Sequence, residues 1–192
     1  MGAIRPVRPV NLICGLISND QDIMARAVRM LSDHAGPTDL ISEPRPFDTT
    51  DYYELEMGQD LKREFASFER LINPDELAHL KIITNELEKR ICYQCGLSTD
   101  RRLVNLDPGY ITLSKLILAT TKDYSHRVYL GQGIYAESTL HYEKGQWLPW
   151  PWTYPDYADT RYHGFFKQVR ERYKDKLSAR GSEDESLRGP GE

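Results

Sequence analysis

The residue types best suited to chemistry gather between residues 105 and 137, in the stretch NLDPGYITLSKLILATTKDYSHRVYLGQGIYAE. Asp107 and Glu137 carry carboxylates that could move protons or hold Mg²⁺, a hard cation that prefers oxygen ligands. His126 could move a proton near neutral pH, as an acid or a base. Because these groups lie between apolar segments, we expect a site built on loops that connect strands, with these three as candidate catalytic residues.

Cationic side chains in the same stretch could hold an anion. The guanidinium of Arg offers paired donors that fit a carboxylate or a phosphate, and the ammonium of Lys adds a point charge. Salt bridges and turn residues on an exposed rim are the alternative interpretation of this charge density. Under the first interpretation, the candidate ligand-binding residues are Tyr110, Lys115, Lys122, Asp123 and Arg127.

Residues 118–123, LATTKD, are similar to a shortened form of the Asn/Thr-Lys-x-Asp loop with which GTP-binding proteins recognise the base. Such proteins also carry a phosphate loop of the form GxxxxGKS or GxxxxGKT. No glycine in this sequence is followed by Lys-Ser or Lys-Thr, and Gly131-Gln-Gly133 lacks the third glycine of a dinucleotide fingerprint. The sequence therefore argues against P-loop-type GTP binding and leaves other nucleotide-binding geometries open.

The three cysteines, Cys14, Cys92 and Cys95, do not suggest a disulfide framework, which indicates a reducing compartment. Cys92 and Cys95 form a single CxxC motif, whereas a structural zinc site needs four ligands. No second CxxC motif and no closely spaced pair of histidines follows. We interpret the cysteines as structural or incidental, with a metal or redox role as the alternative.

Charge and hydropathy limit the partners and the location. The net charge of −4 argues against a general nucleic-acid coat, because the phosphate backbone requires a basic face. RNA binding remains a third option behind the two functions given below. No apolar run approaches the roughly 18–20 residues needed to cross a bilayer. The N-terminal segment MGAIRPVRPVNLICGLIS lacks a small-residue cleavage site, so we expect a cytoplasmic protein with no membrane partner.

Residues 147–157, WLPWPWTYPDY, concentrate tryptophan, tyrosine and proline. Aromatic rings can contact a ligand or a partner protein, and proline disfavours regular structure. The first interpretation is an extended arm that packs over the surface of its own domain, and the second is a contact surface. A polar and aromatic cluster at 48–56 likewise predicts either a capped loop or a second wall of the pocket.

Hydrophobic periodicity and turn residues predict the elements that would position these groups. Residues 10–17 are almost continuously apolar, as in a buried strand, and Gly36-Pro37 ends the helix that follows. Residues 52–72 favour a hairpin, with a helix over 61–72 as the alternative. The predicted elements up to residue 109 are a strand at 10–17, a helix at 20–35, a strand at 39–42, a hairpin over 52–72, a helix at 73–91 and a strand at 102–106 closed by a turn at 107–109.

This order, strand-helix-strand-strand-helix-strand, is that of a ferredoxin-like split βαβ unit. We therefore predict an α+β fold with a ferredoxin-like split βαβ core and a C-terminal β-hairpin and helix. One domain would span residues 1–177, and a disordered charged tail would span 178–192. The remaining predicted elements are a short helix at 113–119, hairpin strands at 127–130 and 134–142, and a last helix at 160–177.

The same residues resemble a known family. The runs SEPRPFDTTDYYELEMG, SFERLINPDELAHLKIITNELEK, RLVNLDPGYITLSKLILATTKDYSHRVYLGQGIYAE and WTYPDY are similar to the bacterial family catalogued as domain of unknown function 4416, over about residues 7 to 173. The resemblance implies a small single-domain bacterial protein with no established activity. Some members carry the automated name "GTP-binding protein". The family supplies no catalytic roles to transfer to this sequence.

Two functions follow as hypotheses. The first is a protein that binds a small phosphate-bearing or nucleotide-like anion in a pocket around residues 105–137, either as an enzyme or as a binding protein. Mg²⁺ is the cofactor that the oxygen ligands there would suit. The second is a non-catalytic interaction module that uses the arm at 147–157 to bind a protein partner.

Overall fold

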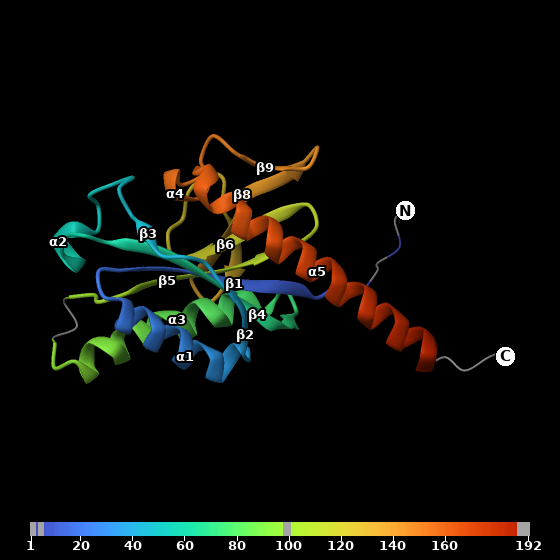
Figure 1. Cartoon of the computed structure of the whole chain (residues 1–192), viewed down its shortest axis with the longest axis horizontal. Helices are drawn as coiled ribbons and strands as arrows, with labels where there is room; N and C mark the ends of the chain where they lie inside the picture. Colours follow the sequence, from blue (N-terminus) through green and yellow to red (C-terminus); the bar gives the residue numbers. More distant parts are fainter. Residues whose placement is uncertain (1–2, 4–5, 98–100, 188–192) are drawn as a thin grey trace.

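The computed structural model describes residue 3 and residues 6–97 and 101–187 of the 192-residue chain. Figure 1 shows how the helices and strands of this part are arranged. The strands are β1 (Val10–Ser18), β2 (Thr38–Ile41), β3 (Arg45–Pro46), β4 (Lys62–Ile72), β5 (Asn105–Ile111), β6 (Lys115–Thr120), β7 (Val128–Gly131), β8 (Ile134–Glu143) and β9 (Gln146–Pro149). The helices are α1 (Gln21–Ala35), α2 (Glu54–Met57), α3 (Glu76–Gln94), α4 (Pro155–Ala158) and α5 (Thr160–Leu187).

In the described part of the chain, the strands form a nine-stranded sheet in the order β2-β4-β1-β5-β6-β8-β7, with β3 added to β4 and β9 to β8. The strands pair antiparallel. α1 and α3 cover one face, and α5 crosses the other (Figure 1). A large antiparallel sheet with helices on its faces confirms the predicted α+β class.

β1 lies at the centre of the core, since all of its residues are buried. Successive side chains of a strand point to opposite faces of the sheet. Leu12 and Leu16 pack in the cluster that includes residues of α1 and α3. Ile13 packs in a second cluster with Phe65 and the α5 residue Phe166. The buried strand predicted at 10–17 is therefore confirmed.

The two predicted long helices before residue 100 are confirmed as α1 and α3. The Asp20 carboxylate caps α1 by accepting hydrogen bonds from the backbone N–H groups of Asp22 and Ile23. Gly36 ends α1 with a φ of +86°, which glycine adopts without the strain that a side chain would bring. Local capping and periodicity thus define these helices.

The first residues of β5 do not pair with β6. The resulting gap between these two strands is where the site lies. The two strands pair over only three residue pairs, beginning at Gly109, whereas β5 stays paired with β1 back to Asn105. Pro108 has no N–H with which to continue the ladder toward β6. Gly109 allows the close approach where the strands do pair. A Cβ there would lie 2.7 Å from Leu118 Cδ2 and would also collide with the carbonyl oxygen of Ile117.

Side chains of α3 replace the missing strand beside Leu106. Lys81 Nζ donates to the Leu106 carbonyl oxygen at 2.7 Å, and Glu88 Oε1 accepts from the Leu106 N–H at 2.6 Å. Residues two helical turns apart share a face, so one side of α3 presents both groups to β5. Buried backbone groups need such partners. The gap is therefore bridged by charged side chains, and the space beside them stays open.

Two predictions near this gap are wrong. Asp107-Pro-Gly109 is not a turn after a strand at 102–106, because it lies inside β5, where pairing with β1 holds it extended. The predicted helix at 113–119 is instead β6, which lies between β5 and β8. A short apolar run suits a buried strand and a helix equally, and the neighbouring strands decide between them.

The hairpin predicted over residues 52–72 is wrong in its first strand. Residues 54–57 form the short helix α2, whereas the second arm is the strand β4, so the alternative helix over 61–72 is also wrong. β4 pairs with β1, β2 and β3, and these partners fix it as a strand.

The C-terminal hairpin is confirmed, since β7 and β8 pair antiparallel. The last helix begins at Thr160 as predicted but continues to Leu187, into the segment predicted as a disordered tail. Residues 188–192 of that predicted tail lie outside the described residues. Within the described residues, every helix is too short or too polar to cross a bilayer.

Candidate functional site

A cavity of about 790 Å³ lies at the gap between β5 and β6. Its size falls in the range of small-molecule sites. α3 lines it from one face of the sheet, and the segment from Tyr154 to Tyr157 lines it from α4. The segment from Phe47 to Glu56 and the end of β6 complete the wall. Side chains from both faces of the sheet therefore border one continuous space.

Three of the predicted site residues, Asp107, Lys122 and Glu137, line this cavity. They come from β5, from the loop after β6 and from β8. The sequence separates them by up to thirty positions, and the strand order β5-β6-β8 places them together. His126 and Arg127 do not line the cavity but contact Glu137, which does.

Glu137 is held by three groups. Its Oε2 accepts from Arg127 Nε at 2.7 Å and lies 3.3 Å from His126 Nε2. The Thr139 hydroxyl donates to its Oε1 at 3.3 Å. Arg127 also donates to the Lys122 carbonyl oxygen at 2.8 Å and to the Tyr154 hydroxyl at 2.7 Å. Arg127 therefore ties the Lys122 loop to two walls of the cavity.

Asp107 is the centre of the charge network. Its Oδ1 lies 3.6 Å from Lys81 Nζ, and its Oδ2 accepts from Asn105 at 2.7 Å and from Arg63 at 3.4 Å. Burial alone would raise the pKa of this carboxyl, but Lys81 and Arg63 outweigh burial and hold the pKa below its ordinary value. Asp107 is therefore ionised at neutral pH.

Glu88 behaves in the opposite way. Burial is the largest influence on its carboxyl and raises the pKa to about 7, against the opposing effect of Lys81. Its Oε2 lies 3.6 Å from Arg102 Nη1, and its side chain is 8% exposed. A carboxyl group that gains and loses a proton near neutral pH therefore lines the same cavity as the ionised Asp107.

Arg63 joins β4 to α4. It donates to Asp156 through Nε at 2.8 Å and also through Nη2, and both side chains are buried. Gly15 makes room for this pair, because a Cβ there would lie 2.8 Å from Arg63 Nη1 and 2.6 Å from the Tyr157 hydroxyl. That hydroxyl is buried without a hydrogen-bond partner, and burial raises its pKa well above the ordinary value. It therefore stays protonated at neutral pH.

Arg102 closes the cavity near α2. It forms a two-pronged pair with Glu56, at 2.9 and 2.6 Å, and donates to Asn105 Oδ1 at 2.8 Å. Asn105 in turn donates to Asp107, so a chain of hydrogen bonds runs from the α2 segment to the centre of the site. Such a network fixes the geometry of its members.

Aromatic and polar side chains share one wall of the cavity. Lys122 Nζ reaches the Tyr52 hydroxyl at 3.3 Å and lies 4.7 Å from the centroid of its ring. The buried hydroxyl of Thr49 has no hydrogen-bond partner within the described part of the chain. Tyr53 and Tyr154 line the same space. The wall therefore combines aromatic rings with polar side chains.

The remaining predicted residues are not among those that line the cavity. Lys115 is exposed at the start of β6, whereas the cavity lies at the other end of that strand. Tyr110 is half-buried and packs against apolar clusters that include residues of α3 and β6. Asp123 is exposed beyond the lining loop. The structure brings together Asp107, Lys122 and Glu137, with His126 and Arg127 behind them.

Sequence reasoning missed Arg63, Lys81, Glu88 and Arg102. Lys81 and Glu88 lie within the predicted helix at 73–91, and both are buried. Charged residues are rarely buried without partners. The available signal was that Lys81 and Glu88 lie seven positions apart beside the apolar stripe of the helix, which could have indicated a shared buried site. Arg63 gives no comparable signal, because its burial depends on Asp156, far away in the chain.

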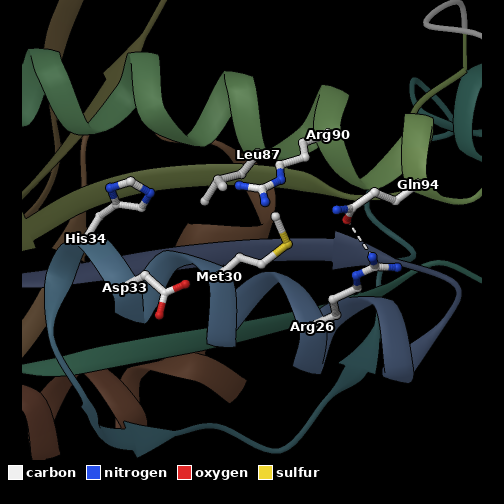
Figure 2. A pocket seen from close by; sticks show the side chains of 7 residues that line it. All are labelled: Arg26, Met30, Asp33, His34, Leu87, Arg90 and Gln94. Carbon is white, nitrogen blue, oxygen red and sulfur yellow. Dashed lines mark hydrogen bonds between the residues drawn. The ribbon is translucent and has the colours of Figure 1, made fainter.

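A second, smaller cavity of about 200 Å³ lies between α1 and α3 (Figure 2). Arg26 of α1 hydrogen-bonds Gln94 of α3 across one end of it. Arg90 reaches over Met30 in the middle, and Asp33 and His34 lie at the other end (Figure 2). It shares no residue with the charge network, and its lining runs from the buried Leu87 to the exposed Asp33, His34, Arg90 and Gln94.

The aromatic arm at 147–157 packs on its own sheet. Trp147 is buried, and the indole N–H groups of Trp150 and Trp152 donate to the Ser138 hydroxyl and carbonyl oxygen. His126 stacks on Trp152 with ring centroids 5.2 Å apart. Trp150 and Trp152 remain 37% and 38% exposed. The arm therefore covers β8 with one edge and presents the other to solvent.

The CxxC pair lies at the end of α3. Cys92 is buried and donates to the Arg101 carbonyl oxygen, and Cys95 is exposed. Among the described residues, no group of three or more His, Cys, Asp and Glu side chains is arranged to hold a metal ion.

Comparison with known proteins adds one match. No curated protein and no solved structure matched the chain. The family model described as "Domain of unknown function (DUF4416)" matched residues 8–173. That span contains the strands, the cavity and the whole charge network. The chain therefore belongs to the family of the domain of unknown function DUF4416.

Proposed function

We propose that the protein binds a small phosphate-bearing or nucleotide-like anion in the cavity between β5 and β6. The observation that supports this most is the convergence of Asp107, Lys122 and Glu137 from three elements in one concave space of about 790 Å³. Concave sites with a few convergent polar groups and perturbed pKa values are the usual locations of small ligands.

Each group has a role in this proposal. Lys122 attracts the anion, and Arg127 positions the Lys122 loop through its backbone carbonyl. The rings of Tyr53 and Tyr154 provide a flat apolar surface for the rest of the ligand. Asp107, Glu137 and His126 are the groups that could carry protons if the bound ligand reacts. The proposal covers a binding protein and an enzyme alike.

We also propose a ferredoxin-like split βαβ unit as the scaffold. The strand order β2-β4-β1-β5, with α1 and α3 on one face, supports it. β6, β8, β7 and β9 would extend this unit from the β5 edge, and the site would lie where the extension begins. In this proposal, residues 1–177 form one domain.

The interaction module remains the second candidate. The observations that favour it are the 37% and 38% exposure of Trp150 and Trp152 in the arm, and the exposed apolar surface on the edge strand β7, where Val128 and Tyr129 are 68% and 59% exposed. Exposed edge strands are common docking points for other chains. Capture of a partner that a Val128→Lys variant no longer binds would support it, and unchanged capture would oppose it.

A thermal-shift assay tests the main proposal. The panel contains inorganic phosphate, sugar phosphates and nucleotides, each with and without Mg²⁺. A ligand at about 100 times its Kd stabilises the native state by about 2.7 kcal/mol, which a melting curve detects. Lys122→Ala removes the proposed anion contact, and Lys144→Ala is the matched control, since Lys144 is 89% exposed on the turn after β8.

The expected result is a rise in Tm for at least one phosphate compound that Lys122→Ala reduces and Lys144→Ala leaves unchanged. The absence of any shift across the panel would remove the proposal. A shift that both variants retain would place the ligand outside this cavity.

A further inference from the structure

The carboxylates that line the cavity all have cationic partners in the protein. Asp156 and Asp107 contact Arg63, and Asp107 also contacts Lys81. The other pairs in this set are Glu56 with Arg102, Glu88 with Arg102, and Glu137 with Arg127. Within the described residues, the cavity wall thus holds no carboxylate without a cation beside it.

The cations are not all compensated in return. Lys89 pairs with Glu86 outside the cavity. In the part of the chain that the structure describes, the Lys122 ammonium contacts only the hydroxyl and ring of Tyr52, and Arg101 has no ion pair. Two positive charges therefore border the cavity with no negative partner, and both side chains are exposed enough to reorient.

From this charge balance we infer that the ligand is a monophosphate ester with an aromatic or heterocyclic ring, such as a nucleoside monophosphate, bound without a divalent cation. The inference rests on the proposed function and specifies its ligand. A phosphate monoester carries a charge of about −1.5 to −2 at pH 7, and Lys122 and Arg101 are the lining cations that could contact it without leaving a carboxylate partner.

A triphosphate fits the same wall poorly. It carries more negative charge than a monoester and normally arrives with Mg²⁺, which takes carboxylate oxygens as ligands. Here those oxygens are already engaged by Arg63, Arg102 and Arg127. Freeing the carboxylate of Asp156 or Glu137 would leave a buried guanidinium without its partner, which is costly.

The remaining contacts suit an uncharged ring with polar edges. Tyr53 and Tyr154 provide ring surfaces on the wall. Thr49 and Tyr157 also line the cavity, and their hydroxyl groups are buried without hydrogen-bond partners in the described part of the chain. The Asn85 side chain also lines the cavity from α3 and has both a donor and an acceptor.

Titration calorimetry with defined probes tests the inference. The probes are AMP, GMP, CMP and UMP, with ATP and GTP as the triphosphates, each in Mg²⁺ and in EDTA. Ribose 5-phosphate and phenyl phosphate separate the contribution of the sugar from that of the ring. The variants are Lys122→Ala and Arg101→Ala, with Lys144→Ala as the control.

The expected result is tighter binding of at least one monophosphate than of its triphosphate, with the same Kd in Mg²⁺ and EDTA. Lys122→Ala or Arg101→Ala should raise that Kd by about tenfold or more, because each removes a charge-assisted contact. Lys144→Ala should leave the Kd unchanged.

Three other results would be informative in different ways. Tighter binding of a triphosphate with Mg²⁺ would overturn the inference and leave the proposed function standing. Binding of no phosphate compound would overturn the proposed function together with the inference. A monophosphate Kd that neither variant changes would also overturn the inference, since the uncompensated cations would then have no part in binding.

Discussion

Asp107 and Glu88 line one cavity, but their carboxyl groups ionise under opposite influences. Burial would raise the pKa of Asp107, yet Lys81 and Arg63 hold it below its ordinary value. Burial raises the pKa of Glu88 to about 7. One carboxyl group is therefore charged at neutral pH while the other exchanges its proton there. Pairs of this kind are where acid and base roles are commonly divided.

The raised pKa of Glu88 predicts that part of the folding stability is lost as the pH rises. Its pKa is about 7 in the folded protein against an ordinary value of 4.5. The favourable contribution is thus complete below about pH 4.5 and is lost as the pH rises through about 7. Glu88→Gln keeps an oxygen for the Leu106 N–H and should remove about 3 kcal/mol of this pH dependence.

Urea unfolding of both proteins at about pH 4.5, 6 and 8 measures this difference. Parallel pH profiles for the two proteins would show that Glu88 does not titrate in this range.

The buried pair of Arg63 and Asp156 predicts a large loss from a small change. Asp156→Asn leaves the guanidinium of Arg63 buried with only the more distant carboxylate of Asp107, and should cost about 3 kcal/mol of folding stability. Asp48→Asn is the control, because Asp48 pairs with Arg161 at the exposed surface and should have a far smaller effect. Denaturant unfolding of the two variants compares them, and equal losses would contradict the prediction.

At the scale of single residues, the sequence could indicate only part of the site. Asp107, Lys122 and Glu137 attract attention because they are polar residues beside apolar strands. Arg63 and Asp156 do not, since each is one charged residue among many until the fold places them together. A charged residue can be recognised as buried only when its partner is known, and the tertiary structure determines which residue that partner is.

At the scale of elements, the Asp-Pro-Gly sequence of β5 does three things in three consecutive residues. Asp107 supplies the central charge of the site, Pro108 lacks the N–H that would extend the pairing with β6, and Gly109 allows the close approach at which that pairing begins. A sequence that normally marks a turn here builds the mouth of a cavity within a strand.

This arrangement predicts that Gly109→Ala weakens the fold at the gap. The added Cβ would collide with the Ile117 carbonyl oxygen, so β6 must shift, at a cost of about 1–3 kcal/mol. Gly164→Ala is the matched control, because a Cβ at Gly164 of α5 meets no described atom within 4 Å and Ala favours a helix. Thermal unfolding should show a lower Tm for the first variant and an unchanged or higher Tm for the second. A Gly109→Ala protein as stable as the parent would contradict this reading.

The elements that could be predicted are those whose signal is local. α1 and α3 carry a helical period and end signals, and β1 is continuously apolar. β6 could not be predicted in the same way, because its apolar run suits either a helix or a buried strand. Its pairing with β8 settles the matter, and that information is spread over distant parts of the chain.

At the scale of the whole molecule, one charge network joins the two faces of the sheet. Lys81 reaches Asp107 from α3, and Asp156 reaches it through Arg63 from α4. The cavity at the gap between β5 and β6 is the passage through which these groups meet. The layers that pack on opposite faces are therefore not energetically separate.

A double-mutant cycle tests this connection. Lys81→Met and Asp156→Asn change opposite ends of the network, so their effects on the free energy of unfolding should be non-additive by at least about 0.5 kcal/mol. Lys81→Met combined with Glu171→Gln, a change at an exposed pair on α5, should be additive. Additivity in both cycles would show that the two faces act independently.

The passage through the sheet has a consequence for signalling within the molecule. A fully paired sheet is a layer of backbone dipoles that keeps the side chains of its two faces apart. Where β5 and β6 separate, charged side chains replace that layer. A change of charge on one face therefore changes the electrostatic potential at the side chains of the other face. A proton taken up by Glu88, or an anion bound beside it, would alter the potential at Asp156 and Tyr157 under α5 without any movement of the backbone.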